Sequence, residues 1–151
     1  MTKLKLETYF NEMNIHIQKL NRAIEVLEEL YPITFDKLEE LNEIQKDKLD
    51  ILVFRFIKLQ DLLGAKIFRN FLDYLEYPIN SDFLSILKEL EKENIVDIDT
   101  WSTFRKLRNT IAHDYPEDDE EKIEAINYLI KNIKYLIEIG QKIEAIYKTH
   151  R

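Results

Sequence analysis

The side chains best suited to ligand binding or catalysis lie close together late in the sequence, between positions 108 and 115. Arg108, Asn109, His113 and Tyr115 bring together a permanent cation, an amide, an imidazole and a phenol. Arginine grips a phosphate with its planar fork, and histidine, with a reference pKa near ~6.5, exchanges a proton near neutrality. Phosphate binding and proton transfer suffice for RNA cleavage, because the ribose 2′-hydroxyl is the nucleophile.

The helical spacing of these residues decides whether they can act on one ligand. At about 100° per residue, Asn109 and His113 share a face, and Arg108 and Tyr115 are nearly aligned. Arg108 and His113 lie about 140° apart around the helix. They converge if the helix end re-aims His113, which Pro116 favours by moving Tyr115 out of the α region. They also converge if a two-fold dimer brings a second copy of the helix opposite the first.

Apolar residues recur every three or four positions through nearly the whole chain, which predicts helices rather than strands. The expected elements are a helix over 6–30 ended by Pro32, a short helix over 35–41 capped by Thr34, a helix over 49–77 closed by Pro78, a helix after the N-cap Ser81, a helix from Asp99 or Thr100 that Pro116 stops, and a last helix opened by the acidic run 117–121. Residues 42–48 are interpreted as a linker or as the exposed start of the next helix.

These elements predict an all-α fold, a single antiparallel up-and-down helical bundle of about four main helices plus one or two short ones. The length of 151 residues fits one domain over 1–151. Trp101 and Phe104 are expected in the core, whereas His16 lies off the apolar stripe of the first helix and is expected at the surface. The broad apolar faces of the two longest helices are compatible with a homodimer.

Composition excludes several classes of function. Without cysteine there is no disulfide scaffold, thiol catalysis or iron–sulfur cluster. The two glycines, Gly64 and Gly140, stand too far apart for a Gly-rich phosphate loop, and no spacing predicts a metal site or a cofactor. The net charge of −7 argues against a non-specific DNA binder, although a local basic patch stays possible. No apolar run predicts a membrane span and the start is too polar for a signal peptide, so a cytoplasmic protein is expected.

The stretch from Arg108 to Tyr115 has the form Arg-x4-His-x-Tyr, with a polar residue, Asn109, after the arginine. This pattern resembles the signature of HEPN-domain proteins. In its full form it resembles the HepT toxins of HEPN/minimal nucleotidyltransferase toxin–antitoxin pairs. The resemblance covers about these eight residues in detail, and the expected all-helical domain in architecture.

The resemblance implies a metal-independent endoribonuclease of a type VII-like toxin–antitoxin pair, without a cofactor, whose homodimer forms one composite site for RNA. Arg108 would bind and polarise the scissile phosphate, and His113 would act as general acid and base. Asn109 would orient the RNA or His113. A nucleotidyltransferase antitoxin would modify Tyr115 with AMP, and the added phosphate would repel RNA and occupy the arginine.

Two other functions stay open. The chain could be a non-catalytic subunit that presents a nucleotide or target to a small nucleotidyltransferase, and the acidic net charge leans this way because a free ribonuclease benefits from a positive field. It could also be a purely structural dimeric bundle in which the motif is a chance match.

Further charged residues could extend the site. Arg105 and Lys106 add positive charge next to the motif and are possible RNA contacts. Three residues of the second long helix approximate one side and form either an RNA track or ordinary solvated charges: Arg55, Lys58 and Lys66. The adjacent Gln60 and Asp61 are either a buried polar pair that supports the site or a polar edge.

Overall fold

The computed structural model describes residues 2–78, 82–112 and 119–150, and these ranges are helical with no strand. The helices are α1 (Thr2–Leu27), α2 (Phe35–Glu39), α3 (Glu43–Leu62), α4 (Phe68–Tyr74), α5 (Phe83–Lys92), α6 (Ile98–Ala112) and α7 (Asp119–His150). A 3₁₀ turn over Glu28–Leu30 follows α1, and a π-helical turn over Leu63–Ile67 joins α3 to α4.

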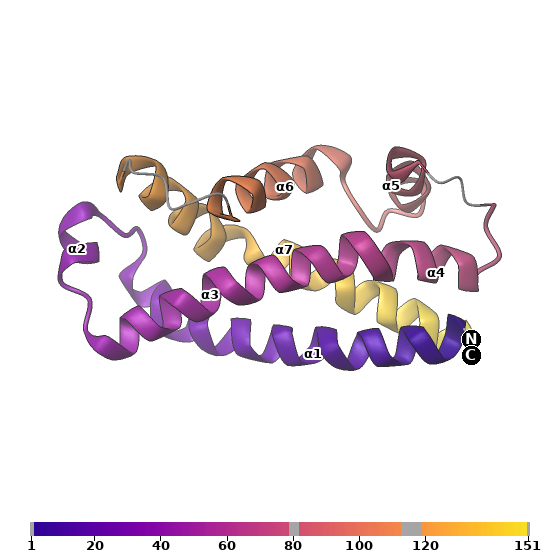
Figure 1. Ribbon diagram of the computed structural model, residues 1–151, viewed down its shortest axis with the longest axis horizontal. Coiled ribbons are helices and arrows are strands. Elements are labelled where there is room, and N and C mark those ends of the chain that lie inside the picture. The colour runs from indigo at the N-terminus through magenta and orange to yellow at the C-terminus, as the bar shows by residue number, and fades with distance from the viewer. Residues whose placement is uncertain (1, 79–81, 113–118, 151) are drawn as a thin grey trace.

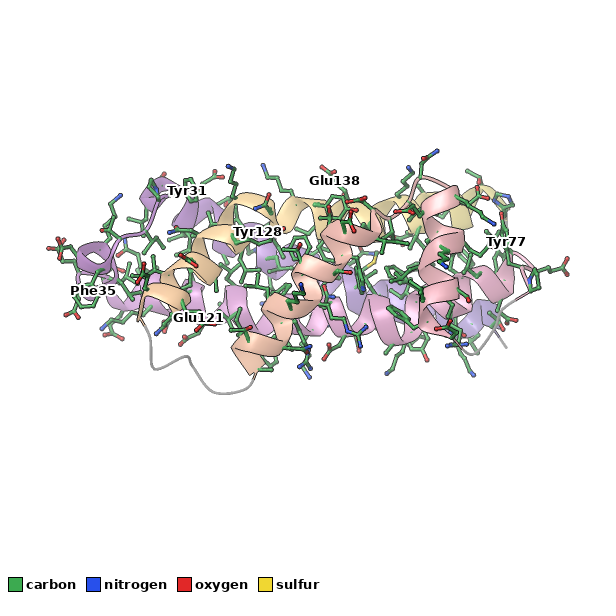
Figure 2. The ribbon with its side chains drawn as sticks, turned by 90° about the horizontal axis from the view of Figure 1, so that it is seen from above. Tyr31, Phe35, Tyr77, Glu121, Tyr128 and Glu138 are labelled. Carbon is green, nitrogen blue, oxygen red and sulfur yellow. The ribbon has the colours of Figure 1, made fainter. Side chains whose placement is uncertain are left out.

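The long helices run up and down the same axis, as expected for an antiparallel bundle (Figure 1). α1, the continuous α3–α4 segment, α6 and α7 alternate in direction, while α5 lies across the bundle (Figure 2). The start of α1 and the end of α7 lie at one end of the molecule, where the Tyr74 hydroxyl donates to the His150 carbonyl oxygen at 3.1 Å. The predicted all-α antiparallel fold is therefore confirmed.

The core is a continuous apolar layer between α1, α3–α4, α6 and α7. α1 packs most extensively against α3, and its buried stripe includes Leu6, Phe10 and Met13. Gly140 of α7 lies against Met13, and a Cβ at this position would come within 2.6 Å of the Met13 sulfur. A bare backbone at position 140 thus allows α7 to approach α1 closely. Trp101 and Phe104 are 2% and 0% exposed, which confirms their predicted place in the core.

Local side-chain caps set the starts of α2 and α3. The Thr34 hydroxyl caps α2 by accepting from the Lys37 amide, as predicted. Residues 42–48 are the start of α3 rather than a linker. Asn42 and Gln45 form a reciprocal capping box there, in which each side chain accepts a hydrogen bond from the other residue's backbone amide.

The predicted helix over 49–77 is neither uninterrupted nor closed by Pro78. It contains the π-helical turn, and its last regular helix, α4, ends at Tyr74. Glu76 adopts a φ of 63°, and the Tyr77 amide donates back to the Leu72 carbonyl at 3.0 Å. A left-handed residue with this backbone bond ends a helix before any proline is needed.

The first residues of α5 and α6 differ slightly from the predicted ones. Asp82 caps α5 through its carboxylate, and the expected cap Ser81 lies outside the described residues. α6 begins at Ile98, earlier than expected, because the Asp97 carboxylate accepts from the Thr100 amide. Pro116 and the first two residues of the acidic run, 117 and 118, also lie outside the described residues.

The expected surface position of His16 is wrong. This side chain is buried between α1 and α3, with 6% of the residue exposed, and its Nδ1 lies 3.0 Å from Nη1 of Arg55. Helical periodicity places His16 beside Ile17 at the edge of the apolar stripe, and the partner on α3 allows the polar ring to be buried.

Among the helices of the described ranges, none has the length and the apolar run that a membrane crossing requires.

Candidate functional site

One face of α6 carries the predicted site residues toward α3. Trp101, Arg105, Arg108 and Asn109 follow helical spacing on this face. Together with residues of α3, the π-helical turn and α5, they line an open cavity of about 470 Å³. Its other lining residues are Gln60, Asp61, Gly64, Ala65 and Phe83. We call this the α3–α6 cavity.

Arg108 is held at this cavity by a carboxylate of the neighbouring helix. Its Nε donates to Oδ1 of Asp61 at 2.9 Å, and its Nη2 donates to Oδ2 at 2.8 Å. The side chains are 28% and 48% exposed, so the pair lies at the rim. The hydrogen bonds to Asp61 raise the pKa of Arg108 further, opposed in part by desolvation. The guanidinium is therefore permanently charged, and Asp61 already balances that charge.

Gln60 and Asp61 thus do not act as one buried polar pair. Asp61 is exposed and joined to Arg108, whereas the adjacent Gln60 is buried, with 4% exposed. The Oε1 atom of Gln60 has no hydrogen-bond partner among the described residues, and the same holds for Nε1 of Trp101. Both residues line the α3–α6 cavity.

The two residues predicted to add positive charge point to opposite sides of α6. Arg105 lines the α3–α6 cavity, and its guanidinium carbon lies 5.9 Å from the ring centre of Phe83. Lys106 lines a different hollow, between α6 and α7, together with Glu121 and Glu124. Only Arg105 therefore shares a cavity with Arg108.

The backbone of α3 is irregular where it meets the indole of Trp101. The π-helical turn Leu63–Ile67 contains Gly64, and a Cβ there would lie 3.1 Å from Cζ2 of Trp101. Single π-helical turns are frequent at functional sites. Apolar periodicity does not reveal this turn, and the signal that the sequence offers for it is an isolated glycine in a helical run.

A second cavity of about 470 Å³ lies between α1 and α3. It includes the three residues of the suggested RNA track, Arg55, Lys58 and Lys66, and meets the first cavity at Asp61 and Ala65. We call it the α1–α3 cavity. The structure thus places the three cations, together with Glu12, at one hollow that neighbours the α3–α6 cavity.

His16 holds Arg55 at the α1–α3 cavity. Burial lowers the pKa of His16, the charge of Arg55 lowers it further, and Glu12 opposes this shift. The imidazole is therefore neutral at neutral pH, and its Nδ1 can accept from Arg55 while Nε2–H faces Glu12, 3.7 Å away. Among the described residues no carboxylate forms an ion pair with Arg55, so its charge is free to attract an anion.

The other two motif residues, His113 and Tyr115, lie outside the described residues. Asn109 is exposed at the rim of the α3–α6 cavity, next to Arg108. Within the described ranges, no three His, Asp or Glu side chains gather as metal ligands would. The described part of the site is therefore a pair of arginines and an amide beside an aromatic hollow, which suits a phosphorylated or planar ligand.

Comparison of the chain with protein-family models, curated proteins and solved structures gives no match.

Proposed function

We propose that the protein is a metal-independent endoribonuclease with Arg108 and His113 as its catalytic pair, like the HEPN-domain toxins that its motif resembles. The supporting observation is the place of Arg108. Its guanidinium stands at the rim of a cavity beside a second arginine, Arg105, and a neighbouring cavity, which shares Asp61 and Ala65 with the first, is lined by three more cations and by Glu12. An RNA strand carries a negative charge on each phosphate, and cations at neighbouring cavities attract such a chain of charges.

In the proposed reaction, Arg108 binds the non-bridging oxygens of the scissile phosphate and stabilises the charge that develops on them. His113 removes the proton from the ribose 2′-hydroxyl, whose oxygen attacks phosphorus. The bond to the 5′-oxygen breaks, and a protonated histidine supplies the proton to this leaving group. The products are a 2′,3′-cyclic phosphate and a 5′-hydroxyl end. Asn109 orients the RNA or the imidazole.

A homodimer completes the proposed site. Helical spacing continued to position 113 would separate Arg108 and His113 by about 140°, so the proposed site forms where two copies of this stretch face each other and bring arginine and histidine onto one phosphate. A minimal nucleotidyltransferase is the proposed antitoxin. It transfers AMP from a nucleoside triphosphate to the Tyr115 oxygen and releases pyrophosphate, and the new phosphate then competes with RNA for arginine. The proposed target is cellular RNA, which places the toxin in the cytoplasm.

Growth arrest on expression in bacteria tests this function. The wild-type chain is expected to arrest growth, and His113→Ala is expected to be harmless at equal expression. Purified protein is expected to cleave RNA in EDTA and to leave cyclic phosphate ends. Equal toxicity of the two chains, or cleavage that survives His113→Ala, would remove the catalytic proposal.

The ion pair of Arg108 favours a second candidate, a non-catalytic substrate-binding subunit of a small nucleotidyltransferase. Asp61 balances the arginine charge in the free chain, which suits a residue that positions a ligand more than one that meets a highly charged transition state. In this case the purified chain cleaves no RNA at any pH, and instead binds a nucleotidyltransferase and increases the activity of that enzyme.

A further inference from the structure

We propose that the α3–α6 cavity is a nucleobase subsite, which takes the base of a nucleotide whose phosphate lies against Arg105 and Arg108. The identity of the natural ligand, the nucleotide next to the scissile phosphate of RNA, rests on the proposed function. The existence of the subsite does not. A free nucleotide presents the same chemistry, and the experiment below separates these two sources.

The cavity has the size and the walls that a heteroaromatic ring requires. Its volume of about 470 Å³ lies within the ordinary range of small-ligand sites. Trp101 and Phe83 form an aromatic wall, with ring centres 6.4 Å apart and planes inclined by 47°. Trp101 is almost fully buried, so Phe83, which is half-buried, is the ring on which a base can stack through its π face.

Two buried polar atoms at the cavity have no hydrogen-bond partner among the described residues, and a base can supply both partners. Gln60 offers an acceptor and Trp101 a donor, both buried and both without a partner in the described structure. Buried polar groups in folded proteins are nearly always paired, so two unpaired groups at one cavity require an explanation. Both atoms are covered here, and a base reaches them after a rotation of the Gln60 amide and a small shift of the indole. The edge of a base presents donors and acceptors side by side and can satisfy both.

The π-helical turn lets the indole of Trp101 pack directly on the backbone. Gly64 has no side chain where a Cβ would stand 3.1 Å from the indole, and the π-helical turn widens the helix at this point. A regular helix with alanine at position 64 would press on Trp101 and narrow the cavity. Gly64 therefore sets the position of the Trp101 indole in the wall of the cavity, whereas helix stability alone favours alanine.

The charged rim fixes the phosphate end of the nucleotide. Arg105 lies over Phe83 and forms no ion pair with a carboxylate of the described residues. Arg108 stands one helical turn further along α6, with Asp61 as its partner. A phosphate at this rim meets two cations and one anion, so its binding is favourable while Asp61 is still in place.

Trp101 is the only tryptophan of the chain, so its fluorescence reports on this cavity. We suggest titrating the protein with AMP, GMP, CMP and UMP, with ribose 5-phosphate as a ligand without a base, and with 2′-O-methyl oligoribonucleotides that resist cleavage. At least one nucleotide is expected to change the emission in a saturable way, and ribose 5-phosphate is not. Calorimetry measures the same affinities in the variants, whatever their intrinsic fluorescence.

Two variants and one control localise the binding. Phe83→Ala removes part of the aromatic wall and Gly64→Ala narrows the cavity, and each is expected to weaken nucleotide binding by about tenfold. Leu84→Ala, at an exposed neighbour on the same helix, is expected to bind as the wild type does. Circular dichroism checks that each variant is folded. If Gly64→Ala does not fold, Gln60→Leu, which removes the buried acceptor, takes its place in the binding measurements.

The outcomes separate the ligands and the two proposals. Oligoribonucleotides that bind more tightly than mononucleotides identify RNA as the source, and the reverse order identifies a free nucleotide. The subsite is refuted if no nucleotide or oligonucleotide changes the emission, if ribose 5-phosphate acts equally, or if Phe83→Ala and Gln60→Leu bind as the wild type does. If the protein cleaves RNA but no ligand gives the expected binding response, the subsite proposal is refuted and the ribonuclease proposal is retained. If nucleotides bind as expected but RNA is not cleaved, the subsite proposal is retained and the ribonuclease proposal is refuted.

Discussion

Arg108 and Asp61 join α6 to α3 through two parallel hydrogen bonds, of 2.9 and 2.8 Å, at the rim of the α3–α6 cavity. The two residues are 47 positions apart in the chain. A pair this exposed contributes little to stability, on the order of 1 kcal/mol or less. Its greater effect is to fix the direction of the guanidinium and to balance its charge. Any phosphate that binds Arg108 therefore competes with the Asp61 carboxylate or shares the arginine with it.

Asp61→Asn is expected to strengthen RNA binding, because it removes the negative charge that balances Arg108. The gain is roughly three- to tenfold in affinity, and the free energy of unfolding falls by less than about 1 kcal/mol. Filter binding with a cleavage-resistant RNA and urea unfolding measure the two quantities. A weaker complex would show that Asp61 acts by aiming the arginine, with its charge of little importance.

Arg108→Lys is expected to abolish most of the proposed cleavage, although it keeps the charge. Lysine is a point charge and does not reproduce the planar fork on a phosphate, and removal of one stabilising donor costs about 10²–10³ in rate. Single-turnover cleavage of a labelled RNA measures the effect. Arg22→Ala, at an exposed arginine of α1 far from the motif in sequence, serves as the control. Full activity of Arg108→Lys would show that a bidentate phosphate contact is not required.

The α1–α3 cavity is expected to set the salt dependence of RNA binding. For single strands the slope of log affinity against log salt is about −0.7 per neutralised phosphate. A double variant, Lys58→Ala with Lys66→Ala, should therefore reduce the slope by roughly one to one and a half. The matched double variant Lys131→Ala with Lys134→Ala, on exposed positions of α7, should leave it unchanged. Identical slopes in the two double variants would remove the RNA track.

The buried His16 is expected to make the protein less stable as the pH falls below neutrality. Burial and Arg55 lower its pKa in the folded chain, so the unfolded chain, with a pKa near ~6.5, binds the proton more readily. Stability is thus complete above about pH 6.5 and decreases as the pH falls toward the lower pKa of the folded state. Besides Arg55, the charged groups that act on the ring are Glu12 of its own helix and Lys58 of α3.

Urea unfolding at pH 7.5 and 5.5 tests this dependence. His16→Asn keeps an acceptor for Arg55 and does not titrate in this range. The wild type is expected to lose more stability between the two pH values than this variant does. Because carboxylates titrate alike in both proteins, the difference between them isolates the imidazole. Parallel loss in both proteins would contradict a lowered pKa at His16.

Local patterns in the sequence were sufficient for the number and order of the long helices and for much of the core, although not for the π-helical turn Leu63–Ile67. Helical spacing of apolar residues identified the long helices, and the short-range bond from Thr34 to Lys37 marks the start of α2. Trp101 and Phe104 are buried as predicted because they lie on the apolar stripe of α6. Each of these features depends on residues within one or two helical turns, which is the range over which periodicity and capping act.

The candidate site could be predicted from the sequence only in part. Arg108 and Asn109 were chosen from the sequence, because their types and spacing lie within one helix. Their partners depend on which helix packs beside α6. Asp61 lies on α3, Gly64 belongs to a π-helical turn, and Phe83 comes from the transverse α5. His113 and Tyr115 stay predictions.

The sequence by itself thus determined the long helices, the Thr34 cap and the residue types available for chemistry, because these follow from contacts a few positions apart. Only the tertiary structure decided that Asp61 balances Arg108, that His16 is buried against Arg55, and that an aromatic cavity opens at the π-helical turn. Each of these depends on side chains from different helices meeting at the bundle surface. The rotation and offset of packed helices set such meetings, and spacing along one chain does not encode them.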